Sequence, residues 1–288
     1  MRNDTGMQFR PLSELNLMDN FLFHAMLAQE DVGEEFCRII LKIILGKEIR
    51  RVKITPQKDI PGIDTNRHGI RMDAYIESVP EGDALDADII PDIYDIEPNK
   101  IWEKETLPKR MRYYHSMMDA SVLASGAGYE KLSNVVTIFI LPYDPFGKSR
   151  MVYTFRNQCV EDHKIIYEDG ALNMILYTKG TEGNPSQELK SMLHYMEKTT
   201  ADNAIGSELG NVQRLVERVK ARKEVDLSYM KSWEWDAYNR DIGREEGIRA
   251  LITSCRNLNV SREDILEQLM ANLSMDKAKA LEYLEKYY

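Results

Sequence analysis

Carboxylate and amide side chains recur at every second position in the stretch 89–100, as Asp95, Glu97 and Asn99. Because successive side chains of a strand point to opposite faces, an extended chain places these three on one face. Mg²⁺ prefers oxygen ligands of this kind, and a bound cation would activate water for phosphodiester hydrolysis. The same spacing is also typical of a half-solvated edge strand that ends at Pro98.

A second carboxylate is expected to face Glu97 from the preceding strand. The run 70–79 alternates with Asp73 on one face, and the acidic, Gly-containing segment 80–86 has the composition of a turn. Two strands joined by so short a turn pair antiparallel, with partners placed symmetrically about it. The midpoint of Asp73 and Glu97 falls inside that turn, so their side chains should lie roughly 5 Å apart. Two carboxylates this close repel, so a cation or a proton must stabilise them, and Asp95 becomes an accessory group.

Basic residues begin about ten positions after Glu97. Lys109, Arg110 and Arg112 crowd the first turns of an amphipathic helix predicted over 105–125. Such a cluster can contact a phosphate backbone beside the carboxylates, and it is equally typical of a solvated helix face. The candidate nucleic-acid-binding residues are Lys100, Lys109, Arg110, Arg112 and Tyr113.

Hydrophobic periodicity predicts the elements that must position these side chains. The predicted helices are 19–28, 34–45, 105–125, 188–199 and most of 212–288, and the predicted strands are 51–55, 70–79, 89–100, 135–141, 151–156 and 171–178. Residues 1–10 are expected to be a disordered leader and residues 56–69 a polar loop. The predicted fold is therefore an α/β domain over residues 1–185, followed by a helical C-terminal region over residues 186–288.

The composition of the 288-residue chain argues against several classes of protein. No apolar run approaches the roughly 18 residues of a membrane span, and the start lacks a secretory signal, so we expect a cytoplasmic protein without membrane contact. Three widely spaced cysteines indicate neither a disulfide framework nor a zinc site. A net charge of −9 argues against bulk coating of nucleic acid. It does not argue against an enzyme that uses bound cations.

The five histidines are scattered, with no metal-ligand spacing between them. His24 and His194 lie in predicted helices and are interpreted as structural. His68 lies in the loop before Asp73 and is the histidine expected nearest to the carboxylates. The sequence has no phosphate-binding glycine loop and no GxSxG motif, so it gives no support for nucleotide binding or serine hydrolase chemistry.

Five segments form an ordered set of motifs. They are Met18-Asp-Asn-Phe-Leu-Phe, Arg71-Met-Asp73, Asp95-Ile-Glu97-Pro-Asn99-Lys, Arg110-Met-Arg112-Tyr-Tyr-His and Phe139-Ile-Leu-Pro-Tyr-Asp-Pro-Phe-Gly147. Over roughly residues 15–200 the chain thereby resembles the PD-(D/E)XK nuclease family transposases, relatives of the Rpn recombination-promoting nucleases of bacteria. The resemblance implies a restriction-endonuclease-like core, in which a central mixed sheet is flanked by helices. It also implies DNA cleavage that depends on Mg²⁺, with Mn²⁺ as an alternative, in recombination or transposition.

Within this resemblance Asp73 and Glu97 match the metal-binding acids, and Asn99 departs from the pattern. The wider superfamily has lysine at that position, and Rpn-type relatives often have glutamine. An amide can orient water or phosphate but carries no positive charge. Lys100 lies on the opposite face if the strand is regular, although Pro98 could distort it. The basic residues of the helix 105–125 could also supply this charge.

Two further alternatives stay open. Glu34 or Glu35 can complete such a site from the second helix, although simple exposure on that helix is the favoured interpretation. The charged segment 243–249 is a candidate self-association surface, through which the C-terminal helices could form a homodimer. The alternative function is a catalytically silent module with a nuclease fold that binds DNA or a protein partner.

Overall fold

The computed structural model describes residues 9–62, 64, 66–78 and 90–288. These residues form two compact units, one of Arg10–Val225 and one of Phe9 with Asp226–Tyr288. The composition change that we placed at residue 186 coincides with the start of a helix, and the chain continues within the first unit to Val225. The expected leader 1–10 and turn 80–86 fall largely outside the described residues.

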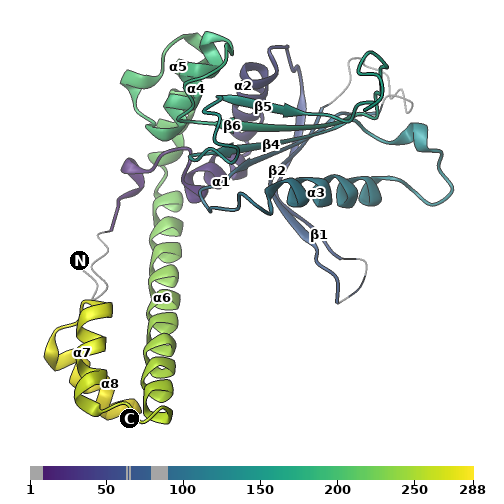
Figure 1. Cartoon of the computed structure of the whole chain (residues 1–288). Coiled ribbons are helices and arrows are strands. Elements are labelled where there is room, and N and C mark those ends of the chain that lie inside the picture. The colour runs from purple at the N-terminus through teal and green to yellow at the C-terminus, as the bar shows by residue number, and fades with distance from the viewer. Residues whose placement is uncertain (1–8, 63, 65, 79–89) are drawn as a thin grey trace. The chain divides into compact units, whose positions relative to one another are not determined.

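A six-stranded mixed sheet forms the centre of the first unit (Figure 1). In spatial order its strands are β1 (Val52–Ile60), β2 (Ile70–Ser78), β3 (Ile93–Pro98), β4 (Val135–Leu141), β6 (Ala171–Tyr177) and β5 (Val152–Phe155). The strands β3, β4 and β6 are parallel, and the remaining pairs are antiparallel. The continuous apolar run of β4 is buried between its two parallel neighbours, as such a run predicts.

One strand boundary differs clearly from the prediction. Residues 56–60 were expected to begin a polar loop, whereas they continue β1 and pair with β2 as far as Ile60. Pro56 is compatible with this because β1 is an edge strand, where a missing N–H costs no ladder hydrogen bond on the solvent side. Pairing with a long neighbouring strand has overridden the local turn signal.

Helices flank the sheet on both sides. In the first unit they are α1 (Asn20–Ala28), α2 (Gly33–Leu45), α3 (Leu107–Val122), α4 (Gln187–Glu197) and α5 (Ser207–Lys220). In Figure 1, α3 runs along one side of the sheet, and α2, α4 and α5 lie toward the other. The apolar face of α3 includes Leu107, Met111 and Met118, which are buried against Phe139 of β4 and its neighbours. α2 ends at Leu45 and is capped by Gly46, whose φ of 65° is the left-handed conformation that glycine adopts without strain.

The second unit is helical. It consists of most of α6 (Lys223–Asn257) together with α7 (Arg262–Leu273) and α8 (Lys277–Tyr287). Ser261 caps α7 by accepting a hydrogen bond from the backbone N–H of Asp264, and Asp276 caps α8, as their sequence context predicts. Among the helices of the described residues, none has the length and apolar character that crossing a membrane requires.

Candidate functional site

Asp73 and Glu97 meet across the β2–β3 pair. The antiparallel register pairs Ala74 with Ile96 and Tyr75 with Asp95, and its continuation places Asp73 opposite Glu97. The backbone N–H of Asp73 donates to Oε1 of Glu97 at 2.7 Å. The register predicted from turn symmetry is therefore confirmed, even though the turn itself lies outside the described residues.

Glu97 is buried and paired with one cation. Only 2% of the residue is exposed, and Oε2 accepts a hydrogen bond from Nη2 of Arg110 at 3.2 Å. Nη1 of Arg110 donates to Oε2 of Glu103 at 2.7 Å, so one guanidinium bridges two carboxylates. Burial raises the pKa of Glu97 well above its usual range, and the charges of Asp95 and Asp73 raise that pKa further. The expected basic helix thus delivers one cation directly to the carboxylates.

Asp95, which we expected to be an accessory group, is buried in the core. It is fully buried, and neither of its carboxylate oxygens has a hydrogen-bond partner among the described residues. Burial raises the pKa of its carboxyl group to about 8. The strand register places it in a row with Tyr75, Thr137 and Asn173, each of which also has a buried side-chain oxygen without a partner in the described structure. Such oxygens are chemically suited to bound water or a cation.

His24, which the sequence pattern led us to interpret as structural, is the histidine that contacts the candidate acids. Its Nε2 lies 2.8 Å from Oδ1 of Asp73, and its Nδ1 lies 2.8 Å from Nε2 of Gln57. Arg71 donates to Oε1 of Gln57, which orients the amide so that its N–H₂ faces the imidazole. In this arrangement Nδ1 of His24 accepts from Gln57 and Nε2 donates to Oδ1 of Asp73.

His68, which was expected nearest to the acids, instead presents its backbone carbonyl to the hydroxyl of Tyr113 and is exposed. Sequence spacing could not reveal the difference, because α1 reaches β2 only through tertiary packing. The one available signal was the position of His24 directly after the motif that begins at Met18. Glu34 and Glu35 are exposed in the first turn of α2, in line with the favoured interpretation.

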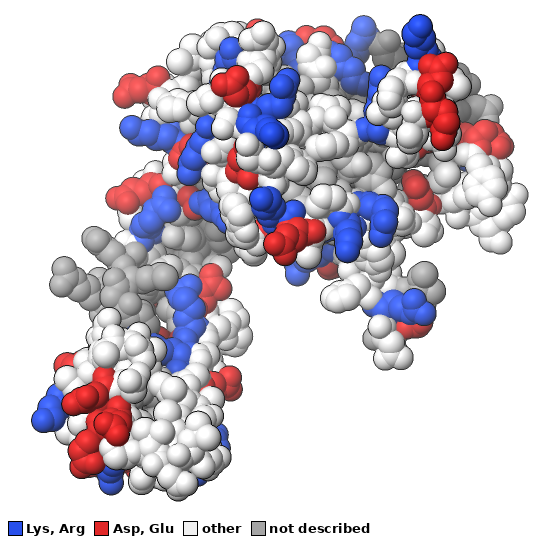
Figure 2. Space-filling view, viewed as in Figure 1, with Lys and Arg blue, Asp and Glu red and all other residues white. Residues whose placement is uncertain are grey.

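The other basic candidates point away from the carboxylates. Lys100 pairs with Asp19 at 2.6 Å. Lys109 and Arg112 are exposed on α3, and neither side chain has an ion pair within the described structure. Tyr113 is 39% exposed. Figure 2 shows Lys and Arg side chains over the region of α3, with acidic side chains beside them. These residues form an outer surface, separate from the half-buried guanidinium of Arg110.

Asn99 holds the loop that follows β3. The strand ends at Pro98, and Oδ1 of Asn99 accepts a hydrogen bond from the backbone N–H of Ile101 at 2.8 Å. Its Nδ2 lies 3.4 Å from Oε2 of Glu103. The amide therefore has a structural task in this loop, and orientation of water by Asn99 stays a prediction.

The carboxylates match the donor type that a hard cation prefers. Asp73, Asp95 and Glu97 supply oxygen ligands from adjacent strands, and the two oxygens of Asp95 have no protein partner in the described structure. As the side chains stand, no group of three or more His, Cys, Asp or Glu among the described residues is arranged to hold a metal ion. Arg110 and His24 occupy oxygens that a metal would use, so metal binding requires these contacts to be shared or released.

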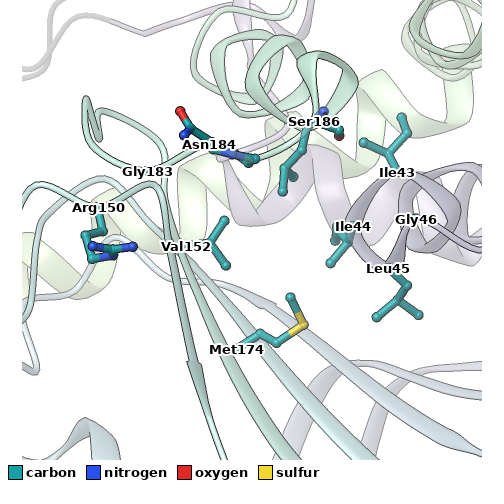
Figure 3. A pocket seen from close by; sticks show the side chains of 12 residues that line it. Ile43, Ile44, Leu45, Gly46, Arg150, Val152, Met174, Gly183, Asn184 and Ser186 are labelled. Atoms are coloured by element: carbon teal, nitrogen blue, oxygen red, sulfur yellow. Dashed lines mark hydrogen bonds between the residues drawn. The ribbon is translucent and has the colours of Figure 1, made fainter.

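A cavity of about 400 Å³ lies elsewhere in the same unit (Figure 3). The end of α2, the strands β5 and β6 and the start of α4 line it, with Ile44, Val152 and Met174 among its apolar walls. Val152 and Met174 are on the sheet face opposite to Asp95, by the alternation along each strand. Its lining includes Arg150 but no carboxylate, so it is separate from the candidate site.

Replacing Arg110 by methionine is expected to lower the free energy of unfolding by about 2 to 4 kcal/mol at pH 8, because Glu97 is left buried without its counter-ion. The loss should shrink as the pH falls, because burial raises the pKa of Glu97 and protonation removes the charge that Arg110 balances. Lys109→Met, an exposed change on the same helix, should alter stability by less than about 0.5 kcal/mol. Urea unfolding measures both, and equal losses in the two variants would contradict the assignment.

In comparisons with family models, curated proteins and solved structures, no match to this chain was found. The chemistry of the carboxylates must therefore be inferred from their geometry and surroundings.

Proposed function

We propose that the protein is a Mg²⁺-dependent DNA endonuclease with a restriction-endonuclease-like core, acting in DNA recombination or transposition. The observation that carries this proposal is the juxtaposition of Asp73 and Glu97 on adjacent antiparallel strands, with the buried Asp95 beside them. Asp73 and Glu97 match the acids of the nuclease motif and lie opposite each other on adjacent strands. The resemblance of the motifs indicates hydrolysis of a phosphodiester bond.

In this proposal Asp73 and Glu97 hold the metal ion. When bound, the ion polarises a phosphoryl oxygen and lowers the pKa of an attacking water. His24 orients the carboxylate of Asp73 through the hydrogen bond from Nε2. Arg110 supplies the positive charge that the motif's lysine would have carried, and it reaches Glu97 from α3 rather than from β3. Lys109 and Arg112 contact the phosphate backbone from the exposed face of α3.

Plasmid cleavage tests the proposal. The purified full chain should convert supercoiled DNA to nicked and linear forms with Mg²⁺ or Mn²⁺, and a chelator should stop the reaction. The assignment fails if the chelator leaves the rate of cleavage unchanged. It also fails if chromatography separates the cleavage activity from the protein.

The alternative is a catalytically silent module with the same fold, and one observation favours it. Arg110 already pairs with Glu97, and His24 already hydrogen-bonds Asp73, as these groups would in a site that no longer binds metal. Calorimetric titration with Mn²⁺ separates the two functions. If the protein is the enzyme, it should bind Mn²⁺, and Asp73→Asn should weaken that binding. If it is the silent module, Asp73→Asn should not change the binding of Mn²⁺.

A further inference from the structure

A large aromatic side chain is exposed in the loop that follows β3, the strand that carries Glu97. β3 and β4 are parallel, so the loops that follow them leave the same edge of the sheet. Trp102 lies in the first loop and is 64% exposed. Tyr143 lies in the second, and its ring centroid is 4.6 Å from that of Trp102 at an interplanar angle of 42°. An exposed tryptophan held against a tyrosine at this edge is a candidate contact for a ligand.

The loop that carries Trp102 is fixed by hydrogen bonds. The hydroxyl of Tyr143 donates to the carbonyl of Ile101 at 2.9 Å and accepts from the backbone N–H of Glu103 at 3.1 Å, so it brackets Trp102 on both sides. Asn99 binds the backbone N–H of Ile101 from the strand end. The exposed ring is therefore presented in one position, which lowers the ordering cost of binding.

This loop is joined to the candidate acids. Glu103, the residue after Trp102, binds Arg110, and Arg110 binds Glu97. Trp102 is thus adjacent in sequence to Glu103, which Arg110 connects to Glu97, a proposed metal ligand. The following segment carries the exposed cations Lys104 and Lys109, whose side chains have no ion pair within the described structure. A flat apolar ring flanked by cations is complementary to a nucleobase on its phosphate backbone.

We propose that Trp102, supported by Tyr143, stacks an unpaired nucleobase of DNA, so that the protein acts on single-stranded or locally unpaired DNA. This inference rests on the proposed function, since it names the substrate class of that same site. A base within a duplex has both faces covered by its neighbours, so stacking on Trp102 requires an unstacked base. Any base can stack on an indole ring, so this contact should select unpaired over duplex DNA without selecting a particular base.

Fluorescence tests the stacking directly. The chain has three tryptophans, so Trp233→Phe with Trp235→Phe leaves Trp102 as the only indole. In that background, with Asp73→Asn added to prevent cutting, an oligothymidylate of roughly 12 nucleotides should quench the emission. An oligonucleotide of equal length with abasic sites in place of its central bases should bind with little quenching, and a blunt duplex should quench less. Equal quenching by intact and abasic strands would overturn the proposal.

Affinity provides the second readout, measured by anisotropy of a labelled oligothymidylate with Asp73→Asn present in every protein. Trp102→Ala should weaken binding by roughly 5- to 100-fold, which is the range for loss of one stacked base. Trp102→Phe should recover most of the affinity. Trp235→Ala removes a tryptophan that is equally exposed, at 64%, and should change nothing. If Trp102→Ala and Trp235→Ala bind alike, Trp102 stacks no base.

These outcomes separate the inference from the proposed function. If quenching depends on the bases but the unmodified protein never cleaves DNA, the stacking site is supported and the nuclease function is contradicted. If Trp102→Ala cleaves single-stranded DNA with a metal ion at an unchanged rate, the nuclease function is supported and the stacking site is contradicted.

Discussion

Asparagine in place of Asp73 is expected to reduce Mg²⁺-dependent DNA cleavage by roughly 10³-fold or more. The carboxylate is a proposed metal ligand, and loss of the ion forfeits several kcal/mol of stabilisation of the transition state, at tenfold in rate for every 1.36 kcal/mol. The amide has nearly the same shape as the carboxylate and can still accept the hydrogen bond from His24. The variant should therefore fold, which circular dichroism and thermal unfolding would verify.

Glu77→Gln is the matched control for this variant. Glu77 lies on the same strand four residues further on, is partly exposed and pairs with Lys53 at 3.8 Å. Its neutralisation removes the same charge from β2 but no proposed ligand, so cleavage should stay within a few-fold of the unmodified protein. Cleavage by a rigorously purified Asp73→Asn protein at the rate of Glu77→Gln would show that Asp73 holds no catalytic metal. A Glu97→Gln protein guards against contamination, since it should be as inactive as Asp73→Asn.

The pairing of Asp73 with Glu97 could be predicted because it depends on local chain geometry. Side chains alternate along a strand, and a short turn fixes which residues face each other, so the register follows from counting along the sequence. The buried β4 followed from its apolar run in the same way. Neither inference required knowledge of how distant elements pack.

The contacts that complete the site could be predicted only in part, because they depend on tertiary packing. His24 reaches Asp73 from α1, and Arg110 reaches Glu97 from α3. Periodicity marks a cluster of basic residues on a helix, but it does not say which member turns inward. The role of Tyr143 as a support for the loop after β3 depends on two parallel strands ending at one edge. Its only signal in the sequence was its place in the motif that starts at Phe139.

The burial of Asp95 was also beyond the sequence, since alternation assigns a face but not a depth. α3 covers that face, as the buried Met118 and Phe139 show. Water is thereby excluded from the middle of the sheet. The carboxyl group of Asp95, which sequence spacing placed beside the candidate metal site, becomes part of the core.

Asp95→Asn is expected to stabilise the protein at pH 8 and to leave its stability nearly unchanged at pH 4. Burial raises the pKa of Asp95 to about 8 in the folded state, whereas an unfolded chain has a pKa of about 3.9. Below pH 4 the group is protonated in both states, so it imposes no cost. Between pH 4 and pH 8 the unfolded state gains by ionising while the folded state does not, so stability falls as the pH rises. Asparagine cannot ionise, and the variant avoids this loss.

The size of the effect follows from the shift in pKa. At 1.36 kcal/mol for each unit, the unmodified protein should lose on the order of 3 to 6 kcal/mol between pH 4 and pH 8 through Asp95. Urea unfolding of both proteins across this range, with a chelator present, measures the difference. Asp59→Asn, at a carboxylate that is 69% exposed on the edge strand, provides the control and should show no comparable rise with pH. A difference between Asp95→Asn and the unmodified protein that is constant with pH would mean that Asp95 is ionised in the folded state. Its charge would then have to be balanced by a partner such as a tightly held cation.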